Sequence, residues 1–251
     1  AGAGGEGLAP PLGLLAVLRA LKRSALLDPL RILAVSEAAL DVGDGDLPDP
    51  AVAGMLGIVR VAARECRRWR VACVDLPAHP GDAAVDLALA DPGDAKGREV
   101  ALRWRVGDLV RLAARLERRA LPPAPRPAWR PGGHVAIVGG AGGIGAALAE
   151  RLAARNRARL TLVGRSPESD AIRALLARIE AAGGQAVYAS ADAADPAALA
   201  AALAAGRDRF GPIHTAIHSA IVMQDRALDG LDDETFARAF AVKAAGTAAL
   251  A

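Results

Sequence analysis

The chain has 251 residues, of which 53% are hydrophobic and 3% aromatic, so it can bury the core of one large or two smaller domains, and this composition argues against disorder. The net charge of +3 comes from arginines scattered beside acidic residues rather than gathered in a stripe, which argues against nucleic-acid binding. The two cysteines and four histidines lack the spacing of a disulfide framework or a metal site. Charges interrupt every apolar stretch before it could span a bilayer. We therefore expect a cytoplasmic protein that binds neither metal, membrane nor nucleic acid.

The first half of the chain predicts an α/β unit without a cofactor-binding turn. Short apolar runs predict strands at Ile32–Val35, Val71–Val74 and Val100–Trp104. Helical periodicity predicts helices at Leu12–Leu27, Ala51–Glu65 and Val110–Arg118. No Gly-rich turn follows any of the strands, so we expect no nucleotide in this half.

Alternating prolines at 122–131 divide the chain, because proline removes backbone donors and favours an extended connector. This break predicts one domain at 1–121 and a second at 132–251. In the second domain, strands are predicted at His134–Val138, Arg159–Val163, Ala186–Ser190 and Ile213–Ile217. Helices are predicted at Ile144–Arg155, Glu168–Ala182, Pro196–Ala205 and Asp233–Ala251. Strands that alternate with long helices require a parallel sheet, so the predicted fold class is α/β with an incomplete doubly wound sheet.

An apolar strand runs directly into a Gly-rich turn that opens a helix at 135–145. Gly139 permits the tight turn, Gly143 lets the backbone approach a pyrophosphate, and Gly145 lets helix and strand pack closely. The helix N-terminus would add unpaired N–H groups and the positive end of its dipole. Glycines also serve ordinary turns, but the strand before, the helix after and the βαβ continuation together favour a dinucleotide site.

The turn after the next strand favours NADP(H) over NAD. It reads Gly164-Arg165-Ser166, without the acidic residue that would bind the ribose hydroxyls of NAD. Arg165 can pair with the additional phosphate of NADP(H), and Ser166 can add a hydrogen bond; the alternative is a solvated arginine at a strand end. Asp192, after the third strand, suits either an adenine contact or a turn.

Taken together, these motifs resemble a known family. The Gly139-x-x-x-Gly143-x-Gly145 spacing, the Gly-Arg-Ser turn, Ala-Asp-Ala at 191–193 and Ile-His-Ser-Ala-Ile-Val-Met-Gln-Asp at 217–225 resemble ketoreductase domains of modular polyketide synthases, within the short-chain dehydrogenase/reductase superfamily. Residues 53–65 and 69–77 resemble the structural subdomain that precedes the reductase half in these synthases. The resemblance implies two Rossmann-like units, a degenerate one without cofactor followed by an NADP-binding one.

Two positions depart from the usual family pattern. Val138 stands where a threonine is usual before the Gly-rich turn, and Ile221 stands where a glycine is usual after the fourth strand. In these respects the chain resembles ketoreductases of synthases that lack built-in acyltransferases.

The resemblance also implies roles for single residues toward NADPH. The pyrophosphate would be held by Gly139, Gly143, Ile144 and Gly145, the 2′-phosphate by Arg165 and Ser166, the adenine by Asp192 and Ala193, and the nicotinamide-side ribose by Ser219 and Ala220. Lys243 matches the lysine of the catalytic tetrad, and Asp225 matches the last residue of a Leu-Asp-Asp triplet that marks one alcohol stereochemistry. The alternatives that the residues alone leave open are a solvated charge at Lys243 and a surface pair of Asp225 with Arg226.

The implied activity is NADPH-dependent reduction of a β-ketoacyl thioester, held on the phosphopantetheine of an acyl carrier protein among neighbouring synthase domains. The Ser, Tyr and Asn that the family places after the lysine have no counterpart here, and the single tyrosine, Tyr188, falls in a predicted strand. We therefore expect a domain cut off after its catalytic lysine and inactive by itself. The alternative is a non-catalytic scaffold domain of the synthase; a free-standing dehydrogenase is disfavoured because the first half has no role in such enzymes.

Overall fold

The computed structural model describes residues 8–24, 29–43, 45–91, 98–120, 122 and 129–250. The chain divides into two compact units, each built on a four-stranded sheet. Unit 1 comprises Ala1–Arg119 and Asp225–Asp233, and unit 2 comprises Ala120–Gln224 and Glu234–Ala251. Most of the Pro-rich connector predicted at 122–131 lies outside the described residues, and the domain boundaries drawn from it stay a prediction. Among the described residues, no helix has both the length and the apolar character that a membrane crossing requires.

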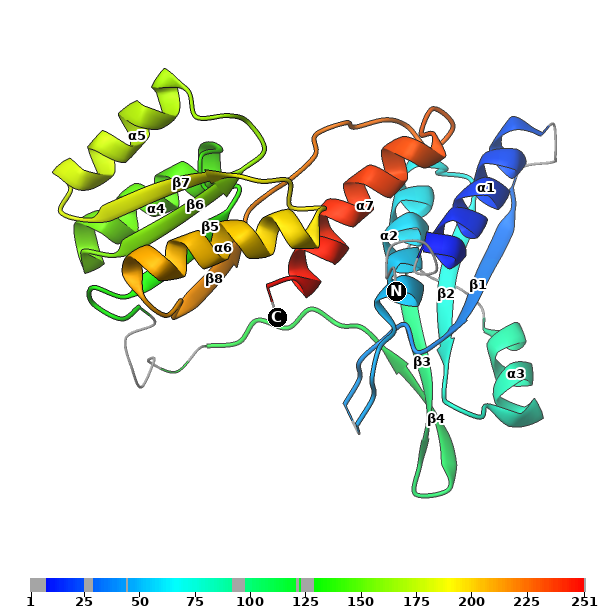
Figure 1. Ribbon diagram of the computed structural model, residues 1–251. Helices are drawn as coiled ribbons and strands as arrows, with labels where there is room; N and C mark the ends of the chain where they lie inside the picture. The colour runs from blue at the N-terminus through cyan, green and yellow to red at the C-terminus, as the bar shows by residue number, and fades with distance from the viewer. Residues whose placement is uncertain are drawn as a thin grey trace. The chain divides into compact units, whose positions relative to one another are not determined.

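Unit 1 is a sheet of order β1-β2-β3-β4, in which the first three strands are parallel and the last is antiparallel. Its elements are α1 (Ala9–Arg23), β1 (Arg31–Glu37), α2 (Pro50–Glu65), β2 (Arg70–Leu76), α3 (Gly81–Ala90), β3 (Arg98–Arg105) and β4 (Asp108–Ala113) (Figure 1). The three predicted strands and the helix α2 are confirmed. The first helix ends at Arg23, and residues 25–27 of its predicted span lie outside the described part.

The helix predicted at Val110–Arg118 is wrong, because residues 108–113 form β4 and residues 114–118 are not helical. Val106 and Gly107 both have positive φ, 52° and 89°, as a two-residue hairpin turn requires. That turn directs the chain back along β3, where pairing overrides the helical periodicity. The helix α3, rich in alanine, was not predicted.

A buried ion pair closes the carboxyl ends of β1 and β2 in unit 1. The Asp75 side chain is fully buried and accepts hydrogen bonds from Ser36 Oγ at 2.8 Å, Ala39 N at 2.8 Å and Arg103 Nη2 at 2.7 Å. Arg103 Nε also donates to Asp46 at 3.1 Å. A buried charge pair is tolerated only when its remaining donors and acceptors are also satisfied, as they are here. The carboxyl ends of the strands, where this ion pair lies, are the edge at which parallel α/β sheets usually bind ligands.

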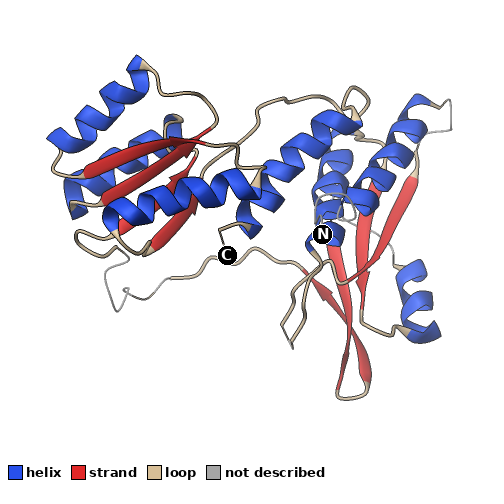
Figure 2. Ribbon diagram, viewed as in Figure 1, coloured by secondary structure: helices blue, strands red, loops and turns tan. Residues whose placement is uncertain are grey.

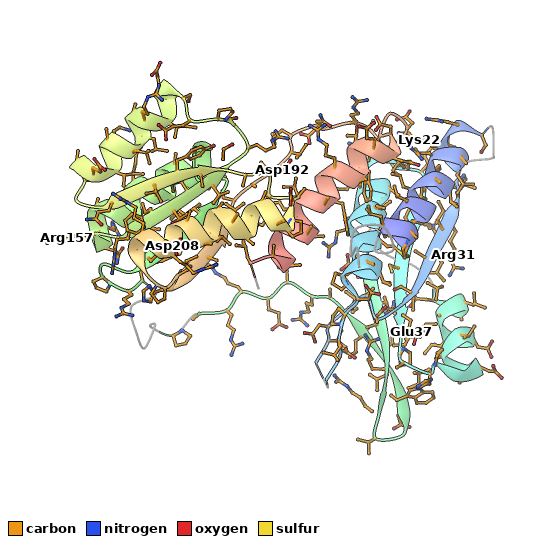
Figure 3. The ribbon with its side chains drawn as sticks, in the orientation of Figure 1. Lys22, Arg31, Glu37, Arg157, Asp192 and Asp208 are labelled. Carbon is orange, nitrogen blue, oxygen red and sulfur yellow. The ribbon has the colours of Figure 1, made fainter. Side chains whose placement is uncertain are left out.

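A segment that follows β8 in the sequence packs into unit 1. Leu228 is 2% exposed, and its N–H donates to Glu65 Oε2 at 2.8 Å. Lys22 of α1, labelled in Figure 3, pairs with Asp229 at 3.1 Å, and Arg19 donates to the carbonyl of residue 231 at 2.7 Å. Residues 225–233 therefore complete the core of unit 1, although the sequence places them between two elements of unit 2.

Unit 2 is a parallel sheet of order β7-β6-β5-β8, which confirms the α/β prediction. Its elements are β5 (His134–Val138), α4 (Gly143–Asn156), β6 (Arg159–Gly164), α5 (Asp170–Ala181), β7 (Gln185–Ser190), α6 (Pro196–Phe210), β8 (Thr215–His218) and α7 (Asp233–Ala248). The predicted end of α6 at Ala205 is wrong. The helix continues because Gly206 serves close packing: a Cβ there would collide with Thr161 of β6.

Helices cover both faces of the unit 2 sheet (Figure 2). The central strand β5 is buried throughout, and its side chains alternate between the two faces. Val135 and Ile137 join the core formed with α4 and α5, whereas Ala136 and Val138 join the core formed with α6 and Val242 of α7. A strand buried on both faces has to be apolar at every position that faces a helix, which explains the continuous apolar run.

The first residue of β5, His134, is buried and neutral. Its Nδ1 lies 2.8 Å from the Gly211 carbonyl, which can only accept, so Nδ1 carries the proton and Nε2 accepts from Thr161 Oγ1 at 2.8 Å. The side chain is fully buried. Burial disfavours the charged imidazolium and lowers the pKa of His134.

This lowered pKa predicts that acid destabilises unit 2. Below about pH 6.5, the ordinary pKa of histidine, His134 binds a proton in the unfolded chain but stays neutral in the folded one. The free energy of unfolding therefore falls as the pH drops. We expect His134→Gln to flatten the dependence of the melting midpoint on pH between about 7.5 and 5.5. His79→Asn, at an exposed histidine with positive φ that asparagine tolerates, should keep the wild-type slope. An unchanged slope in His134→Gln would contradict this assignment.

Candidate functional site

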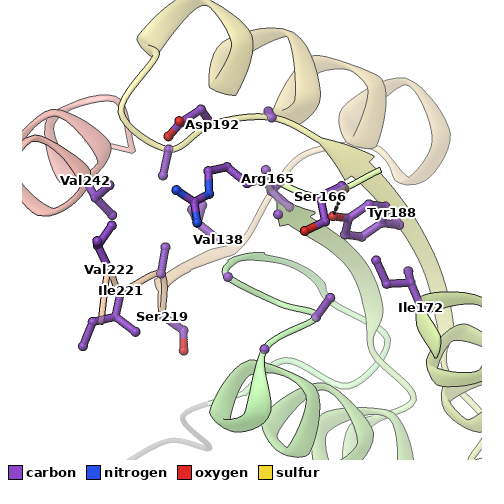
Figure 4. A pocket seen from close by; sticks show the side chains of 18 of the residues that line it. Val138, Arg165, Ser166, Ile172, Tyr188, Asp192, Ser219, Ile221, Val222 and Val242 are labelled. Carbon is purple, nitrogen blue, oxygen red and sulfur yellow. Dashed lines mark hydrogen bonds between the residues drawn. The ribbon is translucent and has the colours of Figure 1, made fainter. Parts of the chain in front are cut away.

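The strand order of unit 2 creates a crevice between β5 and β8. The chain moves from β5 through β6 to β7 in one direction and then crosses to β8 on the other side of β5. The connections leaving β5 and β8 therefore diverge, and such a switch point is where parallel α/β sheets bind ligands. A cavity of about 440 Å³ lies here, lined by residues that follow all four strands and by Val242 of α7 (Figure 4). Its size falls in the range of small-molecule sites.

The turn after β5 is shaped by glycines whose neighbours leave no room for a side chain. Gly139 has φ of 82°, and its N–H donates to the Val163 carbonyl at 2.7 Å. A Cβ on Gly139 would lie 2.5 Å from Ala220 N, and one on Gly145 would collide with the Gly139 carbonyl. The space around Gly143 is open, with nothing within 4 Å of a Cβ. Gly139 and Gly145 are thus required by the fold, whereas the open space at Gly143 remains available to a ligand.

The first turn of α4 has free hydrogen-bonding capacity. Its N-cap is Gly142, which has no side chain to accept from the following N–H groups. The first intrahelical bond is donated by Ala146 N to the Gly142 carbonyl at 2.7 Å. Within the described residues, the N–H groups of residues 143–145 donate no backbone hydrogen bond, so they remain as donors for an anion at the positive end of the helix dipole. The side chain of Ile144 is 80% exposed.

Four residues predicted to bind the adenosine end of a cofactor lie at the cavity. Arg165 and Ser166 line it after β6, and Asp192 and Ala193 line it after β7. In Figure 4 the Arg165 side chain extends toward Asp192 and Val138. Within the part of the chain that the structure describes, no ion pair is formed by Arg165. Asp192 also forms the turn that was the alternative for it, because its Oδ1 accepts from Ala194 N at 2.9 Å.

At the other end of the cavity, the chain leaving β8 lies against the Gly-rich turn. Ser219 N donates to the Val138 carbonyl at 2.7 Å, and Ser219 and Ala220 both line the cavity. Ile221 and Val222 also line it. The side chain of Ile221 is 64% exposed. It therefore stands at the mouth of the cavity rather than filling it.

Five residues predicted at the site are not among those that line the cavity: Gly143, Ile144, Gly145, Asp225 and Lys243. Lys243 is exposed on α7, directly after the buried Val242 that does line it. Asp225 begins the segment that belongs to unit 1. Among the described residues, no group of three or more His, Cys, Asp or Glu side chains could hold a metal ion.

Sequence reasoning missed two polar side chains of β7 at this site. Tyr188 lines the cavity, and its hydroxyl donates to the Ser166 carbonyl at 2.6 Å. Ser190 donates to the Arg165 carbonyl at 3.1 Å. The signal that could have found them is the parallel register, which sets Gly164 opposite Ser190. Tyr188 was interpreted only as a packing residue, and its ring does pack against the core formed with α4 and α5.

Comparison with known proteins agrees with this geometry. Residues 133–251 match the family model of the KR domain. A polyketide synthase of Burkholderia thailandensis, ThaG, is 37% identical over 220 residues, which is 86% of this chain and 4% of that synthase. The first-module ketoreductase of phoslactomycin biosynthesis from a Streptomyces species matches with a TM-score of 0.76 and 30% identity, over 97% of this chain and 55% of that one.

A ketoreductase domain from the bacillaene assembly line shares the fold, with a TM-score of 0.80 at 21% identity, over 100% of this chain and 57% of that one. The chain thus spans about half the length of these solved ketoreductases and a small part of the synthase.

The two glycines at the start of α4 should respond differently to alanine. Gly145→Ala pushes a methyl group into the Gly139 carbonyl and should cost about 1–3 kcal/mol of unfolding free energy. Gly143→Ala enters open space in the first helical turn and should change stability by less than about 1 kcal/mol. Denaturant unfolding of both variants measures the difference; equal losses would contradict the packing described here.

Proposed function

The chain belongs to the ketoreductase domains of polyketide synthases, and from this premise we propose that it binds NADPH and serves the reduction of a β-ketoacyl thioester to the β-hydroxyacyl thioester. The observation that carries the proposal is the cavity at the switch point, where the Gly-rich turn and Arg165 border one space. The alternative, a non-catalytic scaffold, requires no such cavity.

The residues present fit a dinucleotide diphosphate. The open space at Gly143 leaves the main chain approachable, and the N–H groups of residues 143–145 are available as donors. An anion at this position would also gain from the helix dipole. We assign the pyrophosphate to this cradle, formed by Gly139, Gly143, Ile144 and Gly145.

The part of the cavity that follows β6 fits the 2′-phosphate that distinguishes NADPH. Arg165 lines the cavity and forms no ion pair within the described residues, so its guanidinium is available for a bidentate bond to a phosphate. Ser166 can add a hydrogen bond, while Asp192 and Ala193 would border the adenine. No carboxylate follows β6 directly in the position that would repel the 2′-phosphate.

At the nicotinamide end, the chain would position the reacting groups. NADPH supplies the hydride when it is bound. Ser219 and Ala220 would hold the adjoining ribose, and the apolar Val222 and Val242 would exclude water. Lys243 would favour proton delivery through its positive charge, and Asp225 would bear on the configuration of the alcohol.

The substrate and its carrier form a further part of the proposal. We propose that the substrate arrives on the phosphopantetheine arm of an acyl carrier protein, in a cytoplasmic assembly with neighbouring synthase domains. Tyr188 is the single tyrosine of the 251 residues, and its hydroxyl is engaged by the Ser166 carbonyl. It is therefore not placed to protonate a substrate, and we expect this chain by itself to bind NADPH without reducing ketones.

Removal of the Arg165 guanidinium should erase the preference for NADPH over NADH. Charged hydrogen bonds contribute about 1.5–3 kcal/mol, so Arg165→Ala should weaken NADPH binding about 10- to 100-fold and leave NADH binding within about two-fold. Titration followed by cofactor fluorescence measures both affinities. Arg173→Ala, at an exposed α5 arginine paired with Asp170, is the matched control and should change neither. Equal NADPH affinity in wild type and Arg165→Ala would remove the phosphate assignment, and absence of any NADPH binding would favour the scaffold.

A further inference from the structure

Three successive carbonyl groups, those of the last residue of β6 and the two residues after it, each accept a hydrogen bond from β7 or the residue that follows β7. The bonds run from Ala191 N to the Gly164 carbonyl at 2.9 Å, from Ser190 Oγ to the Arg165 carbonyl at 3.1 Å, and from Tyr188 Oη to the Ser166 carbonyl at 2.6 Å. We name these three bonds the β7 clamp. Two of them come from side-chain hydroxyls, so this part of the clamp depends on residue type rather than on the sheet alone.

The β7 clamp engages the carbonyl oxygens of the turn and leaves its phosphate-binding groups for the cavity. Carbonyl oxygens repel a phosphate, whereas a guanidinium, a hydroxyl and N–H groups attract it. With its carbonyls bonded to β7, the turn presents the side chains of Arg165 and Ser166 to the cavity (Figure 4). Gly164 makes room for this arrangement, because a Cβ there would lie 2.8 Å from the Tyr188 hydroxyl.

The Tyr188 hydroxyl remains a hydrogen-bond donor throughout the physiological pH range. Burial, together with the negative charge of Glu168, raises the pKa of its hydroxyl above the ordinary value near 10. A phenolate could not donate to the Ser166 carbonyl, so the bond requires the neutral form. The donor is therefore constant across the pH range in which cofactor binding would be measured.

We propose that Tyr188 and Ser190 are positioning residues for cofactor selection: their hydroxyls fix the turn that carries Arg165 and Ser166, and so set the preference for NADPH over NADH. The inference rests on the proposed role of Arg165 and deepens it. It differs from a purely structural role for Tyr188, whose ring contributes to the core in either case.

The test compares NADPH and NADH affinities of the 251-residue chain after single substitutions. Tyr188→Phe keeps the ring and removes one hydrogen bond of ordinary strength, so NADPH affinity should fall about three- to ten-fold while NADH affinity stays within about two-fold. Ser190→Ala, which should fold even if Tyr188→Phe does not, should lower NADPH affinity about two- to five-fold. Ser24→Ala removes a similar hydroxyl-to-carbonyl bond, 2.8 Å to Leu21 in unit 1, and should change neither affinity.

A double-mutant cycle shows whether the hydroxyls act through Arg165. In an Arg165→Ala background, Tyr188→Phe should lose most of its effect on NADPH, because no guanidinium remains to be positioned. An equal loss of NADPH and NADH affinity, or an undiminished effect in that background, would overturn the positioning role.

The two proposals fail in different ways. If Arg165→Ala removes the preference for NADPH while Tyr188→Phe and Ser190→Ala leave it intact, the β7 clamp is wrong and the phosphate assignment stands. If Arg165→Ala leaves the preference unchanged, the phosphate assignment itself is wrong and the clamp has nothing to position.

Discussion

The backbone contact between the turn after β5 and the chain after β8 is the constraint on which unit 2 depends. Gly139 approaches Ala220 so closely that any side chain on it would push the two segments apart, and Gly145 brings α4 against the same turn. These contacts fix the wall of the cavity, since Gly139, Ser219 and Ala220 all line it. The same close approaches that pack the centre of the sheet therefore also shape the cavity, and a side chain added at Gly139 would disturb both.

The sequence predicted the elements of unit 2 well because their signals are local. A strand buried on both faces is predominantly apolar, and β5 has the predicted bounds, with the polar atoms of its first residue, His134, satisfied by hydrogen bonds. Unit 1 was harder to predict. Residues 110–118 satisfy a helical pattern, but residues 108–113 pair with β3 through the turn at Val106 and Gly107. Alanine-rich α3 has few large apolar residues to mark a period. The helix α6 passed its predicted end because Gly206 packs against Thr161, a contact that no local pattern reveals.

Within the candidate site, local signals again separate the residues that the sequence singled out from those it missed. Gly139 and Arg165 were singled out because their signal is a motif read along one strand and its turn. The hydroxyls of Tyr188 and Ser190 were not, since they act on carbonyls more than twenty residues away across the sheet. At Asp192 the structure contains the turn bond, which is one of the two alternatives that the sequence left open. Asp192 also lines the cavity, and its adenine contact stays a prediction.

The docking of residues 225–233 in unit 1 bears on how such chains can be recombined. Leu228 is buried there and its N–H is held by Glu65, so the polypeptide leaves unit 2 after Gln224 and returns to it at Glu234. Cleavage at the Pro-rich stretch alone would not yield two self-sufficient pieces, because one would carry an exposed leucine and the other would lack part of its core. The two units are interlocked in sequence, so a recombination event that transfers unit 1 has to carry residues 225–233 together with residues 1–119.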